Sequence, residues 1–289
     1  MTGTREYLTV RELADLLRIG ERKVYDLAAS GEVPVTRVTG KLLFPEKEVR
    51  AWIAGLSGRS GAQRPAVLLG SHDPLLDWAV RQSRSGLALR SDGSLDGLVR
   101  FRAGEGVATG LHLRDPGGET WNLARVAEVA DGMDAVLIAW SRRTRGLCWR
   151  PGGGAAIRGI SDLVGRRVVP RAAETGTQEL FERMVAREGL SMTDFDLAPT
   201  APTENDAVMA VAQGQADAAF GLEAVASLFG LSFVPLVEER FDLLVDRRAW
   251  FDPPMQRLFS FCRGTTFRDH ADAVTGVDVS DLGEVRWNG

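Results

Sequence analysis

The chain has 289 residues, of which 44% are hydrophobic and 26% are charged, and its formal net charge is -4 at pH 7. This composition is ordinary for a globular protein with room for one small and one large domain. No apolar run approaches the roughly 20 residues of a membrane span, and the N-terminus is charged where a signal peptide would be apolar. We therefore expect a cytoplasmic protein. Its two cysteines, Cys148 and Cys262, are far apart and are predicted to be packing residues.

Two short helices are predicted near the N-terminus. Thr9 and Glu12 have the spacing of a capping box, so the first helix begins there. Gly20 breaks its apolar pattern, and residues 21–29 restart it. Gly31 is placed to end the second helix, because glycine tolerates the left-handed conformation at a helix terminus.

A hairpin and a third helix complete the predicted N-terminal domain. Residues 37–44 have the pattern of a hairpin with a tight turn, and Pro45 can open a helix behind it. The residues that would close a small core from that helix are Val49, Trp52 and Ile53.

Five motifs lie in order within residues 7–56. They are Leu8-Thr9-Val10, Glu12-Leu13-Ala14, Val24-Tyr25, Gly31-Glu32-Val33-Pro34 and Phe44-Pro45. Together they resemble the winged helix-turn-helix domains of the excisionase and MerR-like family. The resemblance implies that the second helix enters the major groove of double-stranded DNA and that the wing touches its backbone. The DNA-contacting residues that it implies are Thr9, Arg22, Lys23, Tyr25, Arg37, Thr39 and Lys41. The alternative is that they form only a solvated basic face.

The charge distribution separates this domain from the rest of the chain. Residues 1–64 contain 11 Lys or Arg and 8 Asp or Glu, a net charge of +3, which leaves -7 for the remainder. Only the small domain is suited to a polyanion. Because +3 is modest, we expect a homodimer that reads a two-fold related operator.

A short linker is predicted between two domains. Residues 57–65 are rich in Gly, Ser and Arg and end in proline. The predicted domains are therefore a helix-turn-helix at 1–56 and a larger domain at 66–289.

The larger domain shows an alternating strand and helix pattern. The runs at 66–70 and 135–140 are typical of buried strands, and 74–82 has helical spacing. The predicted fold class is α/β, with mostly parallel, doubly wound sheets. The alternating strand and helix pattern restarts near residue 160, which indicates a second lobe. We expect the chain to return to the first lobe near its end, with residues 263–289 as a partly loose tail.

Five segments of this domain form a second recognisable set. They are Leu69-Gly70-Ser71-His72-Asp73-Pro74, Gly93-Ser94-Leu95-Asp96-Gly97-Leu98, Ala108-Thr109-Gly110-Leu111-His112-Leu113, Thr175-Gly176-Thr177 and residues 211–223. The set resembles the type 2 periplasmic-binding-protein fold, in the branch found behind helix-turn-helix domains. The resemblance implies a two-lobed ligand-binding domain. That branch includes proteins linked to molybdate, tungstate and molybdenum-cofactor metabolism.

The turns before three predicted helices favour an anionic ligand. Gly70-Ser71, Gly93-Ser94 and Gly176-Thr177 each place a small backbone and a hydroxyl where free amides and the helix dipole attract negative charge. We expect Ser71, Ser94 and Thr177 to donate hydrogen bonds to an oxyanion, with Thr175 adding another. The alternative for each hydroxyl is simple N-capping.

Histidines, a glutamate and several arginines complete the candidate set. His72 and His112 could donate to an oxyanion or bond a loop carbonyl. Glu223 is expected to cap a helix or, with an organic ligand, to bind an amine. A final group is expected to form a solvated basic loop between the lobes, with phosphate binding as the alternative: Arg142, Arg143, Arg145 and Arg150.

Two functions are consistent with these patterns. The first is a DNA-binding transcriptional regulator that senses molybdate, tungstate or a molybdenum-cofactor-related ligand. The second is a cytoplasmic carrier or molybdoenzyme accessory protein that uses its helix-turn-helix for protein contacts. No nucleophile elbow, phosphate-binding loop or HExxH motif is present, so we expect neither an enzyme nor a resident cofactor.

Overall fold

The computed structural model describes residues 6–38, 40–57, 64–118, 120–152, 156–173 and 175–289. The chain divides between Gln63 and Arg64 into two compact units. The predicted linker at 57–65 falls mostly on positions 58–63, which lie outside the described residues. Within the described ranges, no helix is long and apolar enough to cross a membrane.

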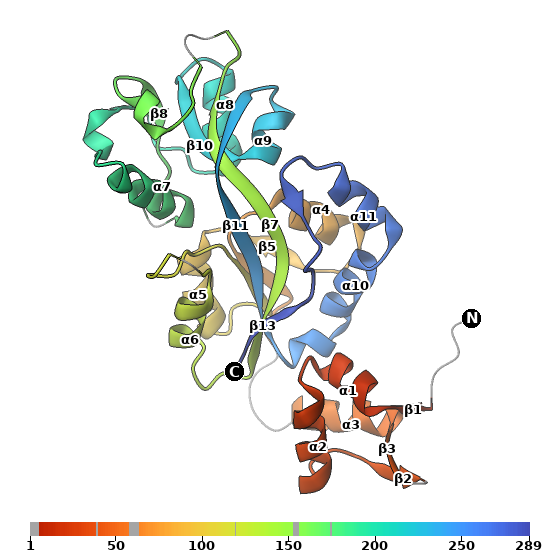
Figure 1. Cartoon of the computed structure of the whole chain (residues 1–289). Coiled ribbons are helices and arrows are strands. Elements are labelled where there is room, and N and C mark those ends of the chain that lie inside the picture. The colour runs from red at the N-terminus through yellow and green to blue at the C-terminus, as the bar shows by residue number, and fades with distance from the viewer. Residues whose placement is uncertain (1–5, 39, 58–63, 119, 153–155, 174) are drawn as a thin grey trace. The chain divides into compact units, whose positions relative to one another are not determined.

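The N-terminal unit combines three helices with a small sheet whose strand order is β1-β3-β2 (Figure 1). Its described elements are β1 (Tyr7–Leu8), α1 (Val10–Leu17), α2 (Glu21–Ser30), β2 (Thr36–Val38), β3 (Lys41–Pro45) and α3 (Glu46–Ser57). The two predicted helices and the hairpin are confirmed, and β1 is an additional strand that pairs with β3. Pro45 ends β3 and α3 begins one residue later.

Local sequence signals set the ends of these helices. Thr9 accepts a hydrogen bond from the backbone of Glu12, whose carboxylate bonds the Thr9 backbone in return, as the capping box predicts. Gly31 ends α2 with a φ of 71°. The apolar sides of the elements meet in a core whose fully buried members are Leu13, Val24, Phe44 and Val49.

The C-terminal unit is built on one curled sheet with the order β5-β4-β6-β11-β7-β10-β8-β9, counted over the described residues. Its strands are β4 (Val67–Gly70), β5 (Ala88–Arg90), β6 (Ala108–Leu111), β7 (Ala135–Trp149), β8 (Arg167–Val169), β9 (Asp196–Leu197), β10 (Ala218–Leu222), β11 (Ser232–Asp246), β12 (Val277–Asp278) and β13 (Val285–Asn288). Its α-helices are α4 (Pro74–Gln82), α5 (Ser94–Arg102), α6 (Leu123–Val129), α7 (Gly176–Arg187), α8 (Glu204–Ala212), α9 (Glu223–Leu228), α10 (Pro253–Cys262) and α11 (Thr265–Asp272). Short 3-10 turns lie at Ile160–Leu163, Met192–Asp194 and Ala249–Phe251.

Two long antiparallel strands join the lobes. β7 and β11 pair along their whole length, from Ser232 opposite Trp149 to Asp246 opposite Ala135. One end of the pair continues into the parallel strands β6, β4 and β5, and the other end into β10, β8 and β9 (Figure 1). The sequence predicted a loop around Arg142 to Arg150, so the continuity of β7 was missed.

Helices cover both faces of each half of the sheet, which confirms the doubly wound α/β fold. In the first lobe, α4, α10 and α11 pack over Trp140, whereas α5 and α6 cover the opposite face around Leu137. In the second lobe, α7 packs on Phe220 and Leu147, and α8 and α9 pack around Ala219 on the other side. Both cysteines are buried and free.

Two predictions about chain segments are wrong. Residues 263–289 are not a loose tail, because they form α11, β12 and β13, and the two strands pair with β7. Arg64, assigned to the linker, belongs to the first lobe. Its guanidinium donates to the carbonyls of Phe101 and Gly106 and pairs with Asp246 at 3.0 Å.

A buried carboxyl on β11 should make stability depend on pH. Asp242 accepts a hydrogen bond from Asn122 Nδ2 at 2.6 Å, and burial raises its pKa from 3.8 to about 6. Between these values the folded state holds a proton that the unfolded chain has released, so stability falls as pH rises from about 4 to 6. We expect Asp242→Asn, which does not titrate, to gain about 2–3 kcal/mol over the wild type between pH 4 and pH 7. Urea unfolding at both pH values measures this gain, and a pH-independent difference would contradict the assignment.

Candidate functional site

A cavity of about 440 Å³ lies where the two lobes of the C-terminal unit meet. Both lobes and the β7 strand contribute to its wall. The lining residues are Ser71, His72, Ser91, Asp92, Gly93, His112, Arg145, Arg171, Ala172, Thr175, Thr177, Pro202, Thr203, Glu204 and Asn205. This volume lies within the range of small-molecule sites, which is about 300–1,000 Å³.

Three helices begin at this cavity. Gly93, Thr175 and Thr203 are the N-caps of α5, α7 and α8, and all three line the cavity wall. The first backbone amides of a helix have no intrahelical acceptor, and the helix dipole places partial positive charge there. The cavity therefore combines the positive ends of helices from both lobes, as the sequence predicted for α5 and α7.

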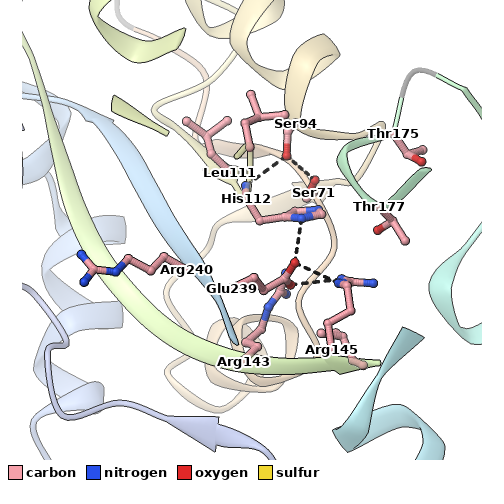
Figure 2. A network of polar contacts seen from close by, with 12 residues as sticks. Ser71, Ser94, Leu111, His112, Arg143, Arg145, Thr175, Thr177, Glu239 and Arg240 are labelled. Carbon is pink, nitrogen blue, oxygen red and sulfur yellow. Dashed lines mark hydrogen bonds and ion pairs between the residues drawn. The ribbon is translucent and has the colours of Figure 1, made fainter. Parts of the chain in front are cut away.

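The predicted first-lobe residues are brought together. The hydroxyls of Ser71 and Ser94 lie 2.7 Å apart, and the backbone N–H of His112 donates to Ser94 Oγ (Figure 2). Ser71, His72 and His112 line the cavity, whereas the fully buried Ser94 supports Ser71 from behind.

The predicted second-lobe residues lie across the cavity from His112 (Figure 2). The Thr175 hydroxyl donates to the Ala172 carbonyl and accepts from the backbone N–H of Gln178. It therefore caps α7, which was the alternative to ligand binding. The Thr177 hydroxyl lies 3.4 Å from a carboxylate oxygen of Glu204. Gly176 packs against His112, and a Cβ there would come within 3.2 Å of the imidazole.

Glu223 lies elsewhere in the domain. It is the first residue of α9, and its carboxylate lies where a side chain at Gly276 would be, beside Thr144. It does not line the cavity. Two other carboxylates do: Asp92, in the first lobe, and Glu204, at the start of α8.

The expected arginine loop is wrong for three of its members, because Arg142, Arg143 and Arg145 all lie within β7. Arg143 and Arg145 lie within β7, and only 2% and 1% of their surfaces are exposed. Residues two apart on a strand share a face, so both guanidiniums point to the same side of the sheet. Arg142, on the opposite face, pairs with Asp278 at 2.6 Å.

Glu239 joins the two buried arginines. Arg145 Nε lies 2.9 Å from one of its carboxylate oxygens, and Arg143 bonds the other (Figure 2). Arg143 also pairs with Asp73, the N-cap of α4, and Arg145 pairs with Glu204 at 2.7 Å. A chain of ion pairs therefore runs from the first lobe through β7 and β11 to the second lobe.

This chain fixes the charge states around the cavity. Burial alone would favour a neutral Glu239, but Arg143 and Arg145 outweigh it and hold its pKa well below the usual range. Burial lowers the pKa of His112, whose Nδ1 lies 3.2 Å from Glu239. Glu239 is therefore ionised and His112 neutral near pH 7.

Arg171 has a different environment. It follows β8 and lines the cavity, yet its Nε and Nη1 are buried without a hydrogen-bond partner among the described residues. Burial lowers its pKa, although Glu204 acts in the opposite direction. His72 Nδ1 is likewise buried without a partner in the described part of the chain. A desolvated guanidinium of this kind is suited to an anionic group that enters the cavity.

Sequence reasoning missed Arg171 and Glu204, and it named Arg145 only as an alternative phosphate contact. A capping signal was available for α8, where the N-cap Thr203 and Asp206, the third residue of the helix, form a capping box. Nothing comparable marks Arg171, whose role depends on the fold around it.

The predicted DNA-contacting residues lie in the N-terminal unit. Arg22, Lys23 and Tyr25 are exposed on α2, while Val24 and Ala28 face the core. Lys41 is exposed on the hairpin. The Thr9 hydroxyl is engaged in its capping box. Thr39 and the Arg37 side chain lie outside the described residues.

Comparison with known families identifies both units. Residues 78–263, almost two thirds of the chain, match the family model of the PBP superfamily domain. The chain belongs to this family. Residues 7–57 match the model of a helix-turn-helix domain. An N-terminal helix-turn-helix followed by a PBP superfamily domain fits a ligand-responsive DNA-binding regulator.

One curated relative and two solved structures are similar to this chain over most of its length. The uncharacterized protein YvgK of Bacillus subtilis (strain 168) is 27% identical over 267 residues, which cover 85% of this chain and 86% of YvgK. PhnD1 from Prochlorococcus marinus (MIT 9301), solved with methylphosphonate, is 10% identical with a TM-score of 0.49, covering 74% of this chain and 92% of PhnD1. OxyR of Corynebacterium glutamicum is 11% identical with a TM-score of 0.49, covering 88% of each chain.

Proposed function

We propose that this protein is a homodimeric transcriptional regulator that binds a small anionic ligand between its lobes and thereby changes its affinity for an operator. The observation that supports an anion most directly is Arg171, whose guanidinium lines the cavity without a partner among the described residues. It is a binding protein rather than an enzyme in this account.

The route from ligand to DNA begins at the lobe junction. A molecule that contacts Ser71 and His112 on one side and Arg171 and Thr177 on the other holds the lobes together. The switch needs only a difference in ligand affinity between two states, with a coupling of about 1–3 kcal/mol. We propose that this coupling changes the affinity of the two DNA-binding domains of a dimer for the operator.

Molybdate and tungstate remain specific candidates for the anion. A tetrahedral oxyanion could use helix N-termini and hydroxyls in the cavity. The volume of about 440 Å³ lies within the range of about 300–1,000 Å³ for small-molecule sites, which also suits a larger organic ligand such as a molybdenum-cofactor-related one. Calorimetric titration of the full chain with molybdate, tungstate and sulfate decides between a bare oxyanion and a larger anion.

DNA binding should depend on the exposed face of α2. We expect Arg22→Ala with Lys23→Ala to lower affinity for selected operator duplexes at least tenfold, because charged contacts to phosphates and bases are lost. The salt dependence of log K should become shallower by about 1 for each lost phosphate contact. Fluorescence anisotropy against duplexes enriched from a random-sequence library measures both quantities.

A charge-matched variant controls for this experiment. Arg81→Ala with Arg158→Ala removes two positive charges from the C-terminal unit, where the Arg158 side chain is 87% exposed. It should leave DNA affinity within about twofold of the wild type. Equal losses in the two double variants, or no DNA binding by the wild type, would reject the proposed role and favour an accessory protein. Sedimentation of the protein with its duplex tests the dimer.

A further inference from the structure

We propose that the ligand has two polar ends: an anionic group bound by Arg171, and a hydrogen-bond-donating group, an ammonium or a hydroxyl, accepted by His112 and Glu204. This inference deepens the proposed function and rests on it. It names the chemical class of the ligand, which the fold does not specify.

The anionic end is placed by Arg171. Two of its guanidinium nitrogens are buried without a hydrogen-bond partner among the described residues, although the side chain lines the cavity. By contrast, the Arg145 guanidinium is already shared between Glu204 and Glu239. Arg171 is therefore the guanidinium that can form paired bonds with a carboxylate or another oxyacid.

His112 supplies an acceptor at the other end. Its Nδ1 lies 3.2 Å from the ionised Glu239, in an ion-pair contact that does not meet hydrogen-bond geometry (Figure 2). Because a carboxylate can only accept, we assign the proton to Nδ1. Because the imidazole is neutral, Nε2 is then unprotonated. Nε2 is the ring nitrogen left to meet a molecule in the cavity, and it requires a donor from that molecule. A bare, fully ionised oxyanion has none.

Glu204 adds a second acceptor, on the second-lobe wall of the cavity beside Thr177. Its carboxylate lines the cavity and accepts from Arg145 and from the backbone N–H of Leu222. Thr177 Oγ1 lies 3.4 Å from its second oxygen, which leaves a lone pair for a further donor. An ammonium or a hydroxyl of the ligand would be attracted to this carboxylate, whereas a second anionic group would be repelled.

Two matched series of probes test the inference by calorimetry on the full chain. The sulfonate series is taurine, isethionate and ethanesulfonate, and the carboxylate series is 4-aminobutanoate, 4-hydroxybutanoate and butanoate. Within each series only the second end changes. In at least one series we expect the amino or hydroxy member to bind at least tenfold more tightly than the plain acid. The relative affinities of the amino and hydroxy members then show whether the donating group is an ammonium or a hydroxyl.

Two variants assign the ends. Arg171→Gln should weaken all members of the responding series by a similar factor. His112→Asn keeps a donor toward Glu239 and removes Nε2, so it should reduce the preference for the amino or hydroxy member to less than threefold. An unchanged preference in a folded His112→Asn protein would overturn the role of this residue.

Other results would overturn the inference as a whole. They are equal or tighter binding of the plain acids, tighter binding of molybdate or tungstate than of every two-ended probe, and no binding of any two-ended probe at millimolar concentration. If molybdate bound tightly and altered DNA affinity, the two-ended ligand would be rejected while the proposed regulator stood. If a two-ended probe bound but DNA affinity never changed, the proposed regulator would be rejected while the two-ended ligand stood.

Discussion

Replacing Glu239 by glutamine is expected to lower the free energy of unfolding of the C-terminal unit by about 3–5 kcal/mol. Glu239 is fully buried and pairs with both Arg143 and Arg145, and glutamine would leave these two guanidiniums in the interior with one negative charge fewer. For a domain of this size the loss corresponds to a fall in Tm of roughly 10 °C. Urea and thermal unfolding, followed by circular dichroism, measure the change.

The adjacent residue provides a matched control. The Glu238 side chain is 63% exposed and only approaches Arg142 at 3.9 Å, so Glu238→Gln should change stability by less than about 0.5 kcal/mol. The difference between the Glu239 variant and the wild type should also shrink in acid. Because the folded-state pKa of Glu239 is lowered, its contribution is present above the ordinary value of 4.5 and is lost as pH falls further. Equal effects of the two variants would contradict a buried ion-pair chain.

Arg171→Gln is expected to change ligand affinity and stability in opposite directions. It removes the charged donor proposed for the anion, so affinity for an anionic ligand should fall about 100-fold. It also removes a desolvated guanidinium that has no partner among the described residues, so the ligand-free protein should become more stable by about 1 kcal/mol. Calorimetry with the tightest-binding probe of the panel, and urea unfolding without it, measure the two effects.

Arg158→Gln supplies the control for this prediction. Its guanidinium is exposed and lies 3.7 Å from Asp162, away from the cavity residues. Both affinity and stability should stay close to the wild type. A loss of stability in Arg171→Gln, with unchanged affinity, would show that Arg171 is a structural residue.

The sequence predicted well those features that depend on short-range signals. The capping box at Thr9, the glycine that ends α2 and the bounds of α4 follow from residue preferences at helix ends, and the structure has them. The positions of Ser94, Thr175 and Thr177 at helix starts, and of Ser71 in the turn before α4, were predictable for the same reason. Their gathering around one cavity required only that strand-to-helix turns meet at one edge of a sheet.

What the sequence could not supply depends on pairing between distant strands. The charges in Trp140 to Arg150 indicated a loop, because a buried strand rarely contains several arginines. They are accommodated only because Glu239 lies opposite Arg143 on β11 and Asp73 and Glu204 approach from two other elements. The assignment of Glu223 to the site failed similarly, because α8 rather than α9 begins at the cavity.

The most direct test of the account is the affinity of the full chain for its selected operator duplex, with and without the tightest-binding probe of the panel. We expect a change of about 5- to 150-fold in the wild type, and no change in Arg171→Gln at the same probe concentration. Arg158→Gln should respond like the wild type. If DNA affinity were identical with and without bound probe, the claim that ligand binding in this cavity controls DNA binding would be contradicted.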